Sequence, residues 1–168
     1  VGFPLGAMDT KSKAFEAKTA VENGASEVDM VINIGWLKNK QYDDVRNDIA
    51  AVKAAVGDKV LKVIIETCLL TDDEKRTACR LAEKAGADFV KTSTGRAGAS
   101  ALSHIRIMRE ALPAHVGIKF SGFGTLNAPE LALWAFFLGA DVLGSPCGDV
   151  VVDVLSSGYA EVGMLAGS

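Results

Sequence analysis

Apolar runs alternate along the chain with amphipathic stretches. The runs are almost continuously apolar, as expected for parallel strands that helices cover. They span residues 27–34, 59–66, 87–91, 116–120 and 140–144. The amphipathic stretches have helical spacing and lie near residues 10–23, 38–55, 71–85, 100–112 and 127–138. The pattern therefore predicts an α/β protein.

Local signals support these helices. Thr71 and Glu74 have the spacing of a capping box, which marks a helix start. The segments "NGASEVD", "KAGADFV" and "LGADVLG" each place a glycine between a helical stretch and an apolar run. Glycine often ends a helix in this way, so the three segments predict one repeated helix–strand connection.

The strand centres recur at roughly even intervals of about 24–32 residues, as in a (βα)8 TIM barrel, which has about 250 residues. Five full strands are visible, and "VGFP" at the start reads as the end of another. We therefore expect residues 1–168 to form one barrel domain that is N-terminally truncated. A doubly wound sheet is the alternative, although no dinucleotide-binding fingerprint favours it.

Composition narrows the functional classes. The formal net charge is −3 without a basic cluster, which argues against a nucleic-acid or membrane-surface partner. No apolar run approaches the roughly 20 residues of a membrane helix, and the start lacks the layout of a signal peptide. The three cysteines are widely spaced and lack metal-ligand spacing. We expect a cytoplasmic protein without a metal site.

Charged residues interrupt four consecutive apolar strands: Asp29, Lys62, Lys91 and Lys119. Barrel enzymes keep their active sites at the C-terminal ends of the strands. Each lysine could instead pair with a carboxylate or extend its amino group to water. Three lysines and a carboxylate on neighbouring strands make that alternative the weaker one, while Lys62 is the member we expect to be a supporting, paired residue.

Amine catalysis would explain these positions. A lysine attacks a carbonyl as the free amine, which is scarce near pH 7 at an ordinary pKa of about 10.4. Burial and a neighbouring cation both lower that pKa. Lys91 would have both, with Lys119 as the cation. We therefore predict that Lys91 forms a Schiff base and that Asp29 moves protons.

The motifs "EVDMVINIG", "LKVIIETCLLT", "FVKTSTG" and "GIKFSG" resemble the deoxyribose-phosphate aldolase family over nearly the whole chain. The resemblance implies a class I aldolase on a (βα)8 barrel that needs neither a metal nor an organic cofactor. It implies a Schiff base on Lys91, with Lys119 and Asp29 in proton transfer. The implied reaction reversibly cleaves 2-deoxy-D-ribose 5-phosphate into acetaldehyde and D-glyceraldehyde 3-phosphate. Family members carry an earlier segment with the first two strands and the start of the third. They are often dimers, so this chain could also form a homo-oligomer.

The resemblance also indicates where the phosphate would bind. The glycine-rich segments 121–125 and 144–149 would follow the last two strands, where barrels often bind phosphate. The candidate substrate-binding residues are Thr94, Arg96, Ser121, Gly122, Gly144 and Ser145. Phe123 replaces a family glycine, and Pro146 and Cys147 replace two serines. The segments could also serve simply as turns.

Two alternatives stay open at this point. One is a related Schiff-base aldolase with a different aldehyde acceptor. The other is a truncated, inactive homologue that acts as an oligomerising or interaction fragment.

Overall fold

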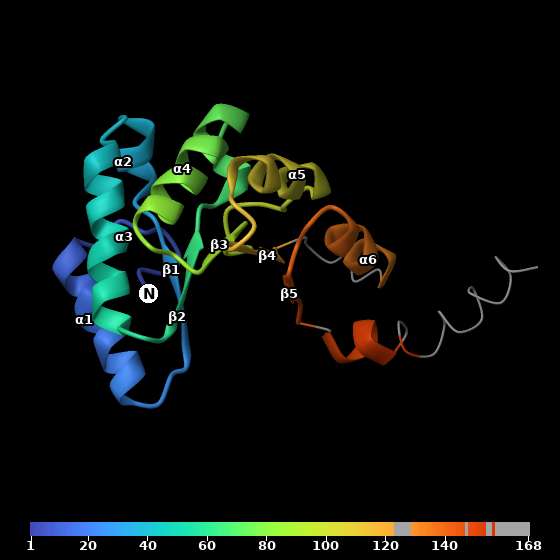
Figure 1. Cartoon of the computed structure of the whole chain (residues 1–168), viewed down its shortest axis with the longest axis horizontal. Coiled ribbons are helices and arrows are strands. Elements are labelled where there is room, and N and C mark those ends of the chain that lie inside the picture. The colour runs from blue at the N-terminus through green and yellow to red at the C-terminus, as the bar shows by residue number, and fades with distance from the viewer. Residues whose placement is uncertain (123–128, 147, 154–155, 157–168) are drawn as a thin grey trace, which may run out of the picture.

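The computed structural model describes residues 1–122, 129–146, 148–153 and 156, and it contains one sheet of five parallel strands (Figure 1). The strands are β1 (Glu27–Val31), β2 (Val60–Ile64), β3 (Phe89–Lys91), β4 (Gly117–Ser121) and β5 (Val142–Gly144). Their order in the sheet is their order in the chain, β1-β2-β3-β4-β5. A TIM barrel has this order, whereas a doubly wound sheet reverses it at a switch point. The expected fold class is confirmed, with five strands present; the single-domain boundary at residues 1–168 stays a prediction.

Helices alternate with the strands along the chain, from α1, which precedes and contacts β1, to α6, which precedes and contacts β5 (Figure 1). They are α1 (Thr10–Glu22), α2 (Ile34–Lys38), α3 (Tyr42–Val56), α4 (Asp72–Lys84), α5 (Leu102–Ala111) and α6 (Pro129–Phe137), with a 3-10 turn η1 (Thr67–Leu69). The capping box is confirmed: the backbone N–H of Thr71 donates to Glu74, and that of Glu74 donates to Thr71 Oγ1. Gly24 and Gly86 follow α1 and α4 with φ angles of 102° and 85°, which suits glycine at a helix end.

Two predicted strands run past the C-terminal ends of the observed strands. Residues 27–34 were expected to form one strand, but β1 ends at Val31 because Asn33 caps α2, accepting a hydrogen bond of 3.1 Å from the Trp36 N–H. The helix expected from residue 38 accordingly begins at Tyr42. The second predicted strand, residues 59–66, ends at Ile64, and Glu66 takes a left-handed backbone conformation. Ile32, Ile34 and Ile65 extend the apolar pattern past both strand ends, which explains the errors.

The helices pack against one face of the sheet. Alternate strand residues point to this face, and they are buried: Val28, Met30, Leu61, Val63, Val90, Ile118 and Phe120. They form a continuous core with apolar residues of the helices, among them Ile49 and Val52 of α3. The intervening strand residues must therefore face the other side, which would be the interior of a barrel.

The first residues extend the sheet beyond β1. The backbone N–H of Val31 donates to the Val1 carbonyl at 3.0 Å, and the Val1 amine donates to the Asp29 carbonyl at 2.6 Å. This pairing agrees with "VGFP" as the end of a further strand.

A fully buried ion pair joins α1 to α3: Lys13 Nζ lies 2.6 Å from Asp48 Oδ2 and donates to the Val31 carbonyl at 3.0 Å.

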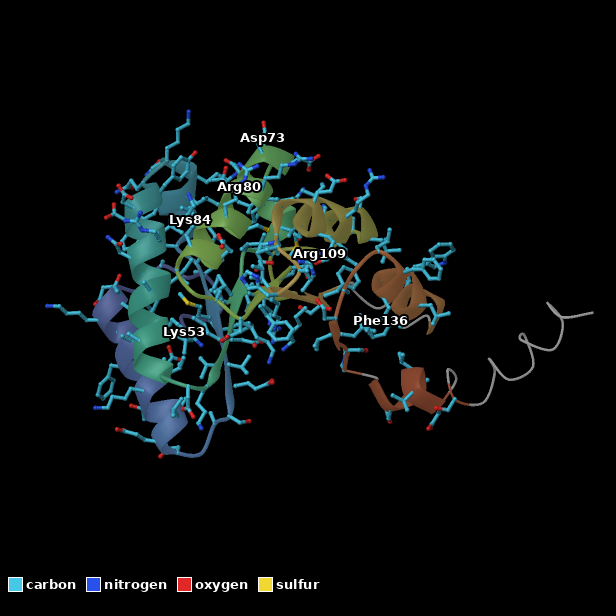
Figure 2. The ribbon with its side chains drawn as sticks, in the orientation of Figure 1. Lys53, Asp73, Arg80, Lys84, Arg109 and Phe136 are labelled. Carbon is cyan, nitrogen blue, oxygen red and sulfur yellow. The ribbon has the colours of Figure 1, made fainter. Side chains whose placement is uncertain are left out.

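Ion pairs and hydrogen bonds also brace the N-terminal ends of the strands. Lys53, labelled in Figure 2, extends from α3 and pairs with Asp88 at 2.7 Å. Arg109, also labelled there, extends from α5 and donates to the carbonyl of Val116 at 2.9 Å. Because Asp88 and Val116 directly precede β3 and β4, these contacts fix the end of the sheet that lies away from the candidate site.

Candidate active site

The strand register places the four charged residues predicted from the sequence on one face. Asp29 is the neighbour of Lys62 across β1 and β2, and Lys91 is the neighbour of Lys119 across β3 and β4. Lys91 also neighbours Ile64, two residues beyond Lys62 on the same strand. Side chains at positions i and i+2 of a strand share a face. All four therefore lie opposite the helix-packed core, and none enters the helix layer.

Three of the four meet at a single oxygen atom. Lys91 Nζ lies 2.6 Å from Asp29 Oδ2, and Lys119 Nζ lies 2.8 Å from the same oxygen. Their side chains are 14%, 18% and 27% exposed for Lys91, Lys119 and Asp29 respectively. Two amino groups thus share one carboxylate in a site that water only partly reaches.

This arrangement shifts the ionisation of the group. Burial lowers the pKa of Lys91 below its ordinary value of 10.5; Lys119 lowers the pKa further, and Asp29 raises it without restoring the ordinary value. Burial would raise the pKa of Asp29, but hydrogen bonds from Lys119 and Lys91 outweigh it and hold that pKa below 3.8. Asp29 is therefore ionised near neutral pH, while Lys91 loses its proton more readily than an ordinary lysine.

Lys62 has a different role in the fold. Its amino group extends from β2 to pair with Glu27 of β1, and it lies 5.5 Å from the centre of the Phe89 ring. The expected pairing with a carboxylate is confirmed. Lys62 is 2% exposed, so this contact stabilises a cation in the layer below the three-residue cluster.

Hydrogen bonds join the segment after β3 to the end of β4. Thr92 Oγ1 donates to the Ser121 carbonyl and accepts from the Ser121 N–H, both at 3.0 Å. Ser121 Oγ donates to the Ser93 carbonyl at 2.8 Å. The buried Ser121 hydroxyl thus joins two segments of this protein, and its predicted role in substrate binding stays a prediction.

Close backbone contacts bring the glycine-rich segments together. Gly122 has a φ of 70°, and a Cβ there would lie 3.1 Å from both the Cα and the N of Gly95. Gly144 is the neighbour of Ser121 across β4 and β5, and a Cβ there would lie 2.9 Å from Ser121 Cβ. Ser145 follows β5 directly. A Cβ at either position would force its neighbours to move, and at Gly122 the positive φ adds strain, so both positions favour glycine.

The predicted departures from the family pattern are only partly visible. Phe123 and Cys147 lie outside the described residues, while Pro146 is described and exposed. The effect of Phe123 and Cys147 on phosphate binding therefore stays a prediction.

Thr94 and Arg96 line a small pocket, of about 90 Å³, together with Glu66 and Leu69. Glu66 was not predicted as a site residue, yet its carboxylate holds Thr94 through two hydrogen bonds, to the N–H at 3.1 Å and to the hydroxyl. An acidic residue directly after an apolar strand is the signal that could have identified it. A larger groove, of about 670 Å³, lies on α1 around Met8 and Phe15 and contains none of the candidate residues.

Within residues 1–122, 129–146, 148–153 and 156, no group of three or more His, Cys, Asp or Glu residues could hold a metal ion. No helix in the same ranges is both long and apolar enough to cross a membrane.

The chain is similar to known aldolases in sequence. A profile of the DeoC/LacD family aldolases matches residues 2–128. The deoxyribose-phosphate aldolase of Finegoldia magna is 54% identical over 154 residues, which are 91% of this chain and 71% of that protein. That of Lactococcus lactis subsp. lactis is 52% identical over 158 residues, covering 94% of this chain and 71% of the relative.

Solved structures lead to the same family. The structure titled "QR15, an Aldolase" superposes with a TM-score of 0.87 at 33% identity, covering 95% of this chain and 72% of that one. The deoxyribose phosphate aldolase from Aeropyrum pernix, described as tetrameric, has a TM-score of 0.80 at 28% identity, covering 94% and 66%. The chain is thus shorter than the relatives that it matches, and it belongs to the DeoC/LacD family of aldolases.

Proposed function

We propose that this chain carries the catalytic centre of a class I aldolase that cleaves 2-deoxy-D-ribose 5-phosphate to D-glyceraldehyde 3-phosphate and acetaldehyde. The observation that carries the proposal is the pair of amino groups, of Lys91 and Lys119, on one oxygen of Asp29. The family membership and the names of the relatives support the same reaction.

The reaction begins at Lys91. Its neutral amine attacks the C1 aldehyde of the open-chain sugar, forming a C–N bond, and loss of water gives an iminium ion. The depressed pKa of Lys91 makes the neutral amine available. The protonated nitrogen then accepts electrons from the substrate.

Cleavage breaks the C2–C3 bond. The C3 hydroxyl gives up its proton, C3 becomes the aldehyde carbon of glyceraldehyde 3-phosphate, and the bonding electron pair moves to the iminium, leaving an enamine. Protonation of the enamine at C2 and hydrolysis of the resulting iminium release acetaldehyde and regenerate Lys91. Asp29 and Lys119 are the groups that we assign to proton transfer, because both lie within hydrogen-bond distance of the reacting amine or of its partner.

The phosphate would bind where the backbone segments after β3, β4 and β5 converge. Gly122, Gly144 and Ser145 would offer backbone N–H groups, and Arg96 would supply a guanidinium, which suits phosphate. The close approach of Gly122 to Gly95 supports this placement, because neither residue has a side chain to keep a phosphate away from the backbone. A homo-oligomer would fit the tetramer described for the Aeropyrum pernix relative.

A cleavage assay tests the proposal. Purified protein is incubated with 2-deoxyribose 5-phosphate or with unphosphorylated 2-deoxyribose, and the released acetaldehyde is measured. We expect cleavage of the phosphorylated sugar, its loss in Lys91→Ala, and its retention in the control Lys18→Ala, since Lys18 is 64% exposed on α1. Full activity of Lys91→Ala would contradict the mechanism. A preference for the unphosphorylated sugar would indicate an aldolase with a different acceptor.

A further inference from the structure

Glu66 is a buried carboxylate held in an unfavourable backbone conformation. It follows β2 by two residues, has φ 54° and ψ 63°, and is 1% exposed. Residues other than glycine, asparagine and aspartate rarely occupy this left-handed region, because the Cβ crowds the backbone. Such strain persists when the surrounding structure requires it, and it often accompanies a functional site.

The contacts of Glu66 make its burial more unusual. Oε1 accepts the Thr94 N–H at 3.1 Å and lies 3.9 Å from Cys68 Sγ, while Oε2 accepts the Thr94 hydroxyl. None of the ion pairs in the described part of the chain involves Glu66. A buried carboxylate without a cationic partner is costly. Its carboxylate accepts hydrogen bonds mainly from Thr94. We infer that the buried Glu66 serves to hold Thr94 in position.

The hydrogen bonds that the Thr94 hydroxyl already forms limit what it can offer to a ligand. A threonine hydroxyl has one proton to donate and two lone pairs. The proton goes to Glu66 Oε2, and one lone pair accepts the Arg96 N–H at 3.0 Å. One lone pair remains. Toward a ligand in the pocket beside Glu66 and Arg96, Thr94 can therefore only accept a hydrogen bond.

We propose that Glu66 is a positioning residue that orients the Thr94 hydroxyl as an acceptor for a hydroxyl group of the sugar phosphate. Thr94 lies three residues after Lys91, so a sugar bound covalently to Lys91 has its hydroxyl-bearing carbons near this end of the sheet. The proposal rests on the proposed aldolase function. It adds a selectivity: the site favours aldehydes with a hydroxyl beyond the reacting carbon over simple aldehydes.

Two substitutions separate positioning from a purely structural role. Glu66→Gln keeps the shape and removes the charge. Glu66→Gly removes the carboxylate and also the backbone strain, because glycine adopts φ 54° freely. Two further variants, Thr94→Val and the double variant Glu66→Gln/Thr94→Val, test whether Glu66 acts through Thr94. Glu22→Gln on α1 is the control, because Glu22 forms a surface pair with Lys18 far from the site in sequence.

Two readouts are compared for each variant. The first is kcat/KM for cleavage of 2-deoxyribose 5-phosphate. The second is the rate of borohydride-trapped adduct formation on Lys91 with acetaldehyde, which has no hydroxyl for Thr94. We expect Glu66→Gln, Glu66→Gly and Thr94→Val each to lower kcat/KM about 10- to 100-fold, the range for the loss of one buried hydrogen bond. The acetaldehyde adduct rate should stay within about twofold, and the double variant should be no worse than the single ones.

An unchanged kcat/KM in Glu66→Gln and Glu66→Gly would overturn the inference. An equal loss of cleavage and of acetaldehyde adduct would also overturn it, since that result indicates general damage to the site. If the unsubstituted protein forms no adduct and cleaves no sugar, the proposed function itself fails, and the positioning role fails with it. The unsubstituted protein therefore distinguishes the two failures.

Discussion

Lys91 and Asp29 are separated by 62 residues in the sequence, yet their amino and carboxylate groups lie 2.6 Å apart. Lys119 approaches the same carboxylate oxygen from the neighbouring strand, at 2.8 Å. Asp29 thus holds two amino groups close together, and this contact lowers the pKa of Asp29 and bears on the pKa of Lys91.

The first prediction concerns pH. Because the neutral amine is the nucleophile and the pKa of Lys91 lies below 10.5, adduct formation on Lys91 should rise with pH, with a midpoint below 10.5. In Lys119→Leu the cation that lowers this pKa is gone, so the midpoint should move to higher pH and the rate at neutral pH should fall. The pH profile of trapped adduct, read by peptide mass spectrometry, measures both. A midpoint unmoved by Lys119→Leu would show that the two amines are not coupled.

Replacing Asp29 should make the free amine of Lys91 more available and yet slow cleavage of the sugar. Asp29 raises the pKa of Lys91, so Asp29→Asn should shift the adduct midpoint to lower pH. Cleavage of 2-deoxyribose 5-phosphate should nevertheless fall by about 10²–10⁴-fold, the usual contribution of a positioned proton-transfer group. Steady-state kinetics beside the adduct profile separates the two effects. Undiminished turnover in Asp29→Asn would remove this residue from the proposed mechanism.

The buried pair of Lys13 and Asp48 predicts an effect on stability alone. Both side chains are fully buried, and no water can replace a lost partner. Asp48→Asn leaves the Lys13 ammonium without its charge partner, so the free energy of unfolding should fall by about 3–5 kcal/mol. Replacing both residues by apolar ones of similar volume should recover most of it. Urea denaturation followed by circular dichroism measures this, and a loss below about 1 kcal/mol would mean that Lys13 reaches water.

Gly122 tests the proposed phosphate site. An alanine Cβ there would crowd Ser93 and Gly95 and push apart the segments after β3 and β4. Gly122→Ala should raise KM for the phosphorylated sugar while acetaldehyde still forms the adduct on Lys91. Gly57→Ala is the matched control, because Gly57 has a similar φ of 63° and nothing within 4 Å of a Cβ. Equal KM values for the two variants would argue against phosphate at this position.

The sequence alone predicts the parallel sheet and identifies the candidate catalytic residues. Continuous apolar runs predict buried parallel strands, and lysines 91 and 119 stand out because burying an ammonium is costly. Alternation along strands then determines which residues share a face, once the register is known. The register itself, and hence the meeting of Asp29 with both lysines, depends on strand pairing between distant residues, which a local pattern does not encode.

The sequence failed where polar residues act through the backbone. Asn33 ends β1 by capping a five-residue helix inside an apolar stretch. Glu66 was assigned to a strand because Ile64 and Ile65 precede it, whereas its left-handed conformation follows from its bonds to Thr94. In both cases the side chain accepts a backbone hydrogen bond that decides the local structure, from the nearby Trp36 N–H for Asn33 and from the distant Thr94 N–H for Glu66.

We propose that Lys91 is a nucleophile of depressed pKa in a site that this chain assembles. The direct measurement is to mix the purified chain with acetaldehyde at neutral pH, reduce it with borohydride, and map the adduct by peptide mass spectrometry. A cooperative thermal melt by circular dichroism first establishes that the sample is folded. We expect an ethyl group on Lys91 in the unsubstituted protein and no corresponding adduct in Lys91→Ala. A folded protein with no adduct, or with adducts spread over exposed lysines such as Lys18, would contradict it.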